Sequence, residues 1–209
     1  MAIETEIKYK VADREILTRI AELDEIDCCR AIDRGIKHHF DTYFDTPDFR
    51  LLREKVVFRL RRFENEAVLT YKAQGGESDG ELHRRHEIEE NTDVTVHDII
   101  QGRIPDLSPV RALYSHAGKV KLFPSLNVDN RRHIIDLTRE EIVFFEIALD
   151  DVRFCGPGGT KEVIECEIEA VHGGIEDLKR VGVWLVKRFD LEPAGPSKYI
   201  IGMELVGGI

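Results

Sequence analysis

The stretch that decides the fold is MAIETEIKYK at residues 1–10, in which Glu4, Glu6 and Lys8 occupy alternate positions. On a β-strand, alternate side chains leave from the same face, so two carboxylates and one ammonium would line one side together. A solvated edge strand tolerates this arrangement, whereas a site for a metal ion and an anion would require it. The later segments have to decide between these two interpretations.

Short segments with alternating charged and apolar residues recur along the chain. In VVFRLRR, Arg59 and Arg61 share one face, and Phe58 and Leu60 share the other. The charged faces of the other segments carry Lys72, Arg85, Glu87, Glu89, Lys119, Lys121, Glu146, Asp150, Glu165, Glu167 and Glu169. Each segment could be a strand with an ordinary wet outer face. Alternatively, the sheet closes into a barrel whose apolar face is outside and whose charged interior is balanced by ion pairs and a charged ligand.

Composition describes one soluble domain spanning residues 1–209, of α+β class and dominated by antiparallel strands. Helices are expected around residues 13–26, as two short helices within 95–118, and over 175–192. No apolar run approaches the roughly 20 residues of a membrane span. The four cysteines show no CxxC spacing, so a reducing, cytoplasmic location without membrane contact is expected. The net charge of −10 argues against general binding of nucleic acid.

An ordered set of motifs resembles the CYTH, or triphosphate tunnel metalloenzyme, superfamily. The set begins with ExExK at residues 4–8 and continues over essentially the whole chain with YFDTP at 43–47, FRLRR at 58–62, LTYK at 69–72, RHEIEE at 85–90, RRHIID at 131–136, ALDDV at 148–152, ExExE at 165–169 and PSKY at 196–199. The resemblance implies an eight-stranded antiparallel β-barrel with flanking helices. It also implies a triphosphate compound bound inside, together with one or two divalent cations.

The resemblance also implies roles for individual residues. Metal ligands are expected among Glu4, Glu6, Asp150, Glu165, Glu167 and Glu169, and catalytic roles for Lys8, Glu165 and Glu167. The alternation and the resemblance together give a substrate-binding set of Lys8, Arg59, Arg61, Lys72, Arg85, Lys119, Lys121, Arg132 and Lys198, with further acidic interior positions at Glu87, Glu89 and Glu146. Strand parity leaves open whether Arg131 or Arg132 faces inward.

The chemistry of these side chains agrees with that implication. Arginine forks suit paired phosphate oxygens, lysine acts as a point charge, and carboxylates suit Mg²⁺ or Mn²⁺. His38 and His39 are not expected to bind metal, since neighbouring strand residues face opposite ways, and surface or packing roles are expected instead.

Three functions remain open. The favoured one is metal-dependent hydrolysis of inorganic triphosphate or a related terminal triphosphate. The alternatives are a class IV adenylyl cyclase, which makes cyclic AMP and pyrophosphate from ATP, and a non-catalytic module that binds polyphosphate or nucleotide. The expected partner is a small-molecule triphosphate or nucleotide, with no nucleic acid apart from a 5′-triphosphate end. The expected assembly is a monomer or a homodimer.

Overall fold

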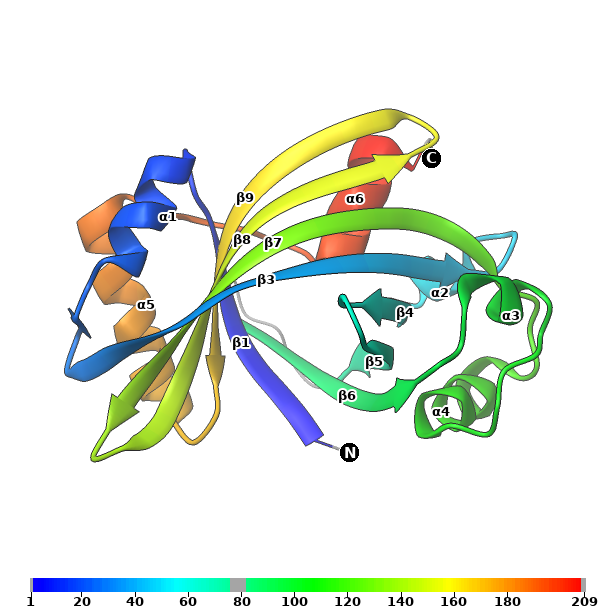
Figure 1. Cartoon of the computed structure of the whole chain (residues 1–209), viewed down its shortest axis with the longest axis horizontal. Helices are drawn as coiled ribbons and strands as arrows, with labels where there is room; N and C mark the ends of the chain where they lie inside the picture. Colours follow the sequence, from blue (N-terminus) through cyan, green and yellow to red (C-terminus); the bar gives the residue numbers. More distant parts are fainter. Residues whose placement is uncertain (1, 76–81, 208–209) are drawn as a thin grey trace.

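The structure, a computed structural model, describes residues 2–75 and 82–207 (Figure 1). The sequence QGGESDG at residues 74–80 is typical of a loop, and its residues 76–80 lie outside the described residues. The strands are β1 (Ala2–Lys10), β2 (Glu25–Ile26), β3 (Cys29–Asp45), β4 (Val57–Arg62), β5 (Ala67–Gln74), β6 (Leu82–Thr92), β7 (Phe123–Arg139), β8 (Ile142–Gly156), β9 (Gly159–Ala170) and β10 (Glu192–Pro193). The helices are α1 (Arg14–Ala21), α2 (Arg50–Arg53), α3 (Val96–Ile100), α4 (Ser108–Ala117), α5 (Ile175–Phe189) and α6 (Lys198–Val206).

Eight of the strands form a closed ring. They pair in the order β1-β6-β5-β4-β3-β7-β8-β9, and β9 pairs back with β1, where Lys8 faces Glu167. All of these pairings are antiparallel. The antiparallel α+β class is therefore confirmed, and the closure gives the sheet an inside and an outside.

The apolar faces of the strands point outward, beneath the helices. Phe58 and Leu60 of β4 belong to a buried cluster that also contains residues of α3 and α4, whereas Cys166 and Ile168 of β9 pack in a second cluster with α1 and α5. The third cluster differs, because it joins α6 to Val128 of β7, which shares a strand face with Arg132; α6 therefore packs on the inner face of the ring. Figure 1 shows α1 and α5 at one end of the long strands and α3 and α4 at the other. The alternation therefore leaves the charged faces to the interior of the ring.

Two glycines allow helices α5 and α6 to lie very close to the strands. A Cβ atom on Gly182 of α5 would lie 2.3 Å from the hydroxyl of Tyr9, and a Cβ atom on Gly202 of α6 would lie 2.4 Å from Leu126 Cδ2. Both distances are far below van der Waals contact, so only glycine allows these helices to approach the ring so closely. No helix in the described ranges, 2–75 and 82–207, has the length and apolar character needed to cross a membrane.

Two sequence expectations about elements are corrected. The segment KVKLF at 119–123 is not a strand, because β7 begins only at Phe123 and the preceding residues connect it to α4. The sequence predicts that Pro105 and Pro109 separate the two short helices, but Pro109 lies in the first turn of α4, which suits a residue that lacks an N–H. The amphipathic helix expected around residues 13–26 is confirmed over Arg14–Ala21, with the Asp13 side chain accepting a hydrogen bond from Ile16 N, whereas Glu25–Ile26 forms the short strand β2.

Candidate active site

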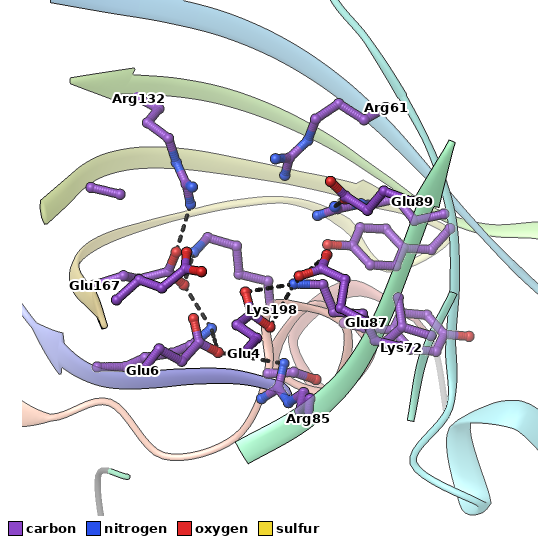
Figure 2. Close-up of a pocket in the computed structure, with 18 of the residues that line it drawn as sticks. Glu4, Glu6, Arg61, Lys72, Arg85, Glu87, Glu89, Arg132, Glu167 and Lys198 are labelled. Atoms are coloured by element: carbon purple, nitrogen blue, oxygen red, sulfur yellow. Dashed lines mark hydrogen bonds and ion pairs between the residues drawn. The ribbon is translucent and has the colours of Figure 1, made fainter. Parts of the chain in front are cut away.

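The interior of the ring holds a cavity of about 250 Å³ whose walls are mainly charged (Figure 2). The strands β1, β6, β8 and β9 contribute carboxylates to the cavity or to the layer directly beneath it. The lining residues are Glu4, Glu6, Lys8, Tyr43, Val57, Arg59, Arg61, Lys72, Arg85, Glu87, Glu89, Arg132, Glu146, Ala148, Glu167, Glu169, Ser197, Lys198 and Tyr199. The cavity thus brings together most of the side chains that the sequence predicted.

One acidic cluster is already paired with buried cations. Carboxylate oxygens of Asp150, Glu165 and Glu167 lie within 4.8 Å of one another. Lys198 Nζ lies 2.9 Å from Asp150 Oδ2 and 2.8 Å from Glu165 Oε2, and it also pairs with Glu167. Arg132 forms a two-pronged contact with Asp150, at 2.8 and 2.7 Å. Burial by itself would raise the pKa of Asp150, but Arg132 and Lys198 hold that pKa at about 2, so this carboxylate is ionised.

A second ion-paired group lies at the other side of the cavity. Both carboxylate oxygens of Glu4 accept hydrogen bonds from Lys72 Nζ at 2.8 Å, and Glu87 Oε1 lies 2.9 Å from the same ammonium. One lysine therefore serves two carboxylates. Burial, opposed by Lys72 and reinforced by Glu4, raises the pKa of Glu87 to about 7.

A third group of carboxylates is short of positive charge. Glu169 is the cross-strand neighbour of both Glu6 and Glu146, and within the described residues neither Glu146 nor Glu169 has a recorded ion pair. Burial first, and then the charges of Glu4 and Glu6, raise the pKa of Glu169 to about 8. The Oε1 atom of Glu6 accepts no hydrogen bond, although Lys8 Nζ is 3.2 Å away. Four carboxylates therefore face one region with too little compensating charge.

The basic wall is held in place by a residue that the sequence reasoning did not select. Asp41 of β3 accepts two hydrogen bonds from Arg61, both at 2.8 Å, and lies 3.5 Å from Arg59 Nη1. Arg59 also contacts Glu89 at 3.3 Å. Asp41 shares a strand face with Tyr43, so the parity of the FDTYFD segment was an available signal. Tyr43 and Tyr199, which line the cavity, were also missed.

The structure settles or corrects three of the predicted basic positions. Arg132 faces the cavity, whereas Arg131 lies on the outer side of the sheet in a groove next to α1. Lys119 and Lys121 do not line the cavity, contrary to expectation, because they lie exposed on the connection before β7. The Nζ atom of Lys121 instead lies 5.0 Å from the ring centre of Phe123.

A closed ring of strands around a cavity of paired cations and surplus carboxylates defines an enclosed ionic site, whose side chains are of the types that suit a polyanion and a cation. Comparison with known proteins is more specific. The chain belongs to the CYTH domain family, whose domain matches residues 2–189. The membership inferred from the motifs is therefore confirmed.

Relatives of known name agree with this assignment. An inorganic triphosphatase of Haemophilus influenzae is 27% identical over 142 residues, which are 66% of this chain but only 37% of that protein. The match thus spans well under two thirds of the relative's length. A structure of an adenylyl cyclase homologue from Hippeastrum, described as having a dominant triphosphatase activity, has a TM-score of 0.70 at 18% identity, covering 96% of this chain and 95% of its own.

A structure named as an adenylate cyclase from Bacillus halodurans has a TM-score of 0.67 at 19% identity, covering 96% of this chain and 98% of its own. At these identities the likeness of the two structures establishes the fold and leaves the reaction to be argued from the site.

Proposed function

We propose that this chain is a metal-dependent triphosphatase that binds inorganic triphosphate, or a related terminal triphosphate, inside the ring of strands. On this proposal the ring is the barrel-shaped triphosphate tunnel of the family, and residues 1–209 form one domain. The observation that carries the proposal is the cavity itself, in which cations from several strands converge on one small volume beside carboxylates that lack compensating charge.

The cations suit the phosphate chain. Triphosphate carries about four negative charges near neutral pH, so several fixed cations are needed to hold it. Arg59 and Arg61 of β4 and Arg132 of β7 offer forked N–H groups to the cavity, and Lys72 and Lys198 offer point charges. Arg85, whose Nη1 lies 3.8 Å from Glu6, completes the set. The present carboxylate partners of these cations keep them in place until an anionic ligand competes for them.

The carboxylates suit a divalent cation. Glu4, Glu6 and Glu169, with Glu146 beside them, are oxygen donors with surplus negative charge, which is the donor set that Mg²⁺ and Mn²⁺ prefer. We propose that these residues hold the first ion. A second ion at Asp150, Glu165 and Glu167 would have to compete with the ammonium of Lys198. A bound divalent ion would supply Lewis-acid polarisation of a phosphoryl oxygen.

This chain's own side chains would do the rest of the chemistry. Lys8 lies between Glu6 and Glu167, where its ammonium can offset charge that develops on a phosphate oxygen. Burial would raise the pKa of Glu167, but Lys198, Lys8 and Arg132 hold that pKa well below its usual range. Glu167 is therefore ionised. We propose that a carboxylate of the Glu165–Glu169 run accepts the proton of the attacking water, so that no covalent intermediate is needed.

A product assay tests the proposal. Purified protein is incubated with inorganic triphosphate or with ATP, each with Mg²⁺ or Mn²⁺. Orthophosphate from triphosphate, with little from ATP, is the expected result. Cyclic AMP and pyrophosphate from ATP would replace the proposal with a cyclase, and tight binding without any product would replace it with a binding module.

Two variants separate the proposed metal and phosphate roles. Glu6→Gln is expected to abolish metal-dependent turnover and to retain the fold, because the substitution removes buried negative charge. Arg59→Ala is expected mainly to weaken triphosphate binding. Glu66→Gln, at an exposed position in the β4–β5 hairpin, is the matched control and should behave like the parent. Turnover by Glu6→Gln and Arg59→Ala equal to that of the parent would show that the assigned site is wrong.

The cellular setting is part of the same proposal. All four cysteines are free thiols, which agrees with a reducing compartment, and we propose a cytoplasmic location. A small triphosphate is the proposed ligand, and a 5′-triphosphate end of RNA is the one form of nucleic acid that the site chemistry would accept.

A further inference from the structure

Lys198 reaches the cavity from a helix and not from a strand of the ring. It is the first residue of α6, which packs on the inner face of the long strands, and its side chain is only 7% exposed and ends among three carboxylates. Figure 1 shows α6 beside the long strands β7, β8 and β9. The side chains that belong to strands of the ring are placed by the hydrogen-bond ladder. The position of Lys198 depends instead on how the start of α6 is seated.

A buried carboxylate connects the start of α6 to the ring. Asp45, at the end of β3, is 1% exposed. Its two oxygens accept hydrogen bonds from the backbone N–H groups of Thr46, Leu51 and Leu52, at 2.7, 2.8 and 2.9 Å. The hydroxyl of Tyr199 donates to Asp45 Oδ2 at 2.7 Å. One carboxylate therefore joins the end of β3, the first turn of α2 and the residue that follows Lys198.

The geometry around Asp45 is rigid. Three of its partners are backbone groups, so the carboxylate cannot move to follow the phenol. Tyr199 is fixed from two further sides: its hydroxyl lies 2.9 Å from Ser125 Oγ, and its ring stacks on that of Tyr43, with centroids 5.1 Å apart and planes inclined by 1°. The side chain of Ser197 caps the same turn by accepting a hydrogen bond from Ile200 N. The direction in which α6 presents Lys198 is therefore set by Asp45 and Tyr199.

We propose that Asp45 and Tyr199 form a latch that positions Lys198 in the cavity, and that triphosphate binding depends on this latch. Asp45 is a positioning residue, since it does not line the cavity and its carboxylate already accepts hydrogen bonds from three backbone N–H groups and from Tyr199. This inference rests on the proposed function only for its second half, the dependence of triphosphate binding. The seating of Lys198 is a property of the protein without ligand.

The seating is tested by chemical labelling of lysine. Wild-type protein, Tyr199→Phe and Tyr114→Phe are treated with acetic anhydride, and acetylation of Lys198 is followed by mass spectrometry. Tyr114→Phe is the matched control, because it removes the same hydroxyl from a half-buried tyrosine of α4, which packs in a different cluster from α6. Tyr199→Phe keeps the stacked ring and loses only the hydroxyl. A hydrogen bond to a charged group is lost in this variant, so Lys198 should react roughly tenfold faster.

The expected result is faster acetylation of Lys198 in Tyr199→Phe and a wild-type rate in Tyr114→Phe. Equal rates in the two variants would overturn the latch. This readout needs no ligand, so it decides the inference even if wild-type protein fails to bind inorganic triphosphate, an outcome that would count against the proposed function alone.

The dependence of triphosphate binding on the latch is tested by a double-mutant cycle. The affinity for inorganic triphosphate with Mn²⁺ is measured by calorimetry for wild type, Tyr199→Phe, Lys198→Met and the double variant. If Tyr199 acts through Lys198, Tyr199→Phe weakens binding roughly tenfold in wild-type protein and has no further effect once Lys198 is methionine. Fully additive losses would mean that Tyr199 acts on the ligand independently of Lys198, and they would refute the proposed coupling.

Discussion

Replacement of His39 by asparagine is expected to reduce the amount of unfolding free energy that the protein loses at acidic pH. His39 is only 2% exposed, and neither ring nitrogen has a hydrogen-bond partner among the described residues. Burial, followed by the charges of Arg61 on β4 and Arg132 on β7, lowers its pKa to about 3, although Asp41 on β3 and Asp150 on β8 oppose this. The imidazole is therefore neutral in the folded protein at pH 5 and above.

The direction in which stability changes with pH follows from proton linkage. In the unfolded chain a histidine has a pKa near 6.5, so at pH 5 the unfolded state binds a proton that the folded state does not. Stability is therefore lost as the pH falls below 6.5, and it is unaffected at pH 8, where both states are neutral. Between pH 8 and pH 5 the loss is about 1.5 pH units multiplied by about 1.36 kcal/mol, or about 2 kcal/mol. This figure holds for any folded-state pKa below about 4.

Urea or thermal unfolding of wild type, His39→Asn and His38→Asn at pH 5 and pH 8 provides the assay. His38 is the neighbouring, exposed histidine of the same strand, and it serves as the control. The difference in unfolding free energy between the two pH values should shrink by about 2 kcal/mol in His39→Asn, or roughly 4–8 °C in melting temperature, and stay unchanged in His38→Asn. An unchanged difference in His39→Asn would refute the argument, and constant packing effects cancel in this comparison.

Three further outcomes are expected from other parts of the molecule. Lys119→Ala and Lys121→Ala should leave the affinity for inorganic triphosphate unchanged, because both side chains lie exposed on the connection before β7; a loss of affinity measured by calorimetry would contradict this placement. Lys198→Met should lower the unfolding free energy in urea by about 3–5 kcal/mol, since three buried carboxylates lose a common cation, and equal stability would contradict the ion pairs. Gly182→Ala should cost about 1–3 kcal/mol, because the added Cβ would lie 2.3 Å from the Tyr9 hydroxyl; Ala in place of Gly at the open, exposed position 174 is the control in the same melts, and an unchanged melting temperature for Gly182→Ala would contradict the close approach of α5.

The sequence alone predicted which strand faces carry charge. Because side chains alternate along a strand, residues such as Arg59 and Arg61, or Glu165 and Glu167, had to share a face wherever the strands lay. The nearly exclusive use of charged residues on those faces then indicated an enclosed ionic site. The structure places these four side chains inside the ring, or directly beneath its cavity, as the alternation required.

Alternation is also the reason why some side chains could not be placed from the sequence. Alternation fixes relative faces only within a strand, so it could not show which of Arg131 and Arg132 faces inward, nor that Lys119 and Lys121 precede the strand instead of belonging to it. These outcomes depend on where β7 begins and how it is registered against β3 and β8, which the long-range pairing of the sheet decides.

What the sequence by itself determined is therefore the local chemistry: charged strand faces, the residue types that suit phosphate and a divalent cation, and the amphipathic helices. Only the tertiary structure decided how the charges are shared. Asp41 pairs with the arginines of β4, and Lys198 of α6 pairs with three carboxylates on β8 and β9. The physical reason is that ion pairing inside a closed ring depends on distances between residues far apart in the chain, and these distances are set by strand register and by the packing of helices against the ring.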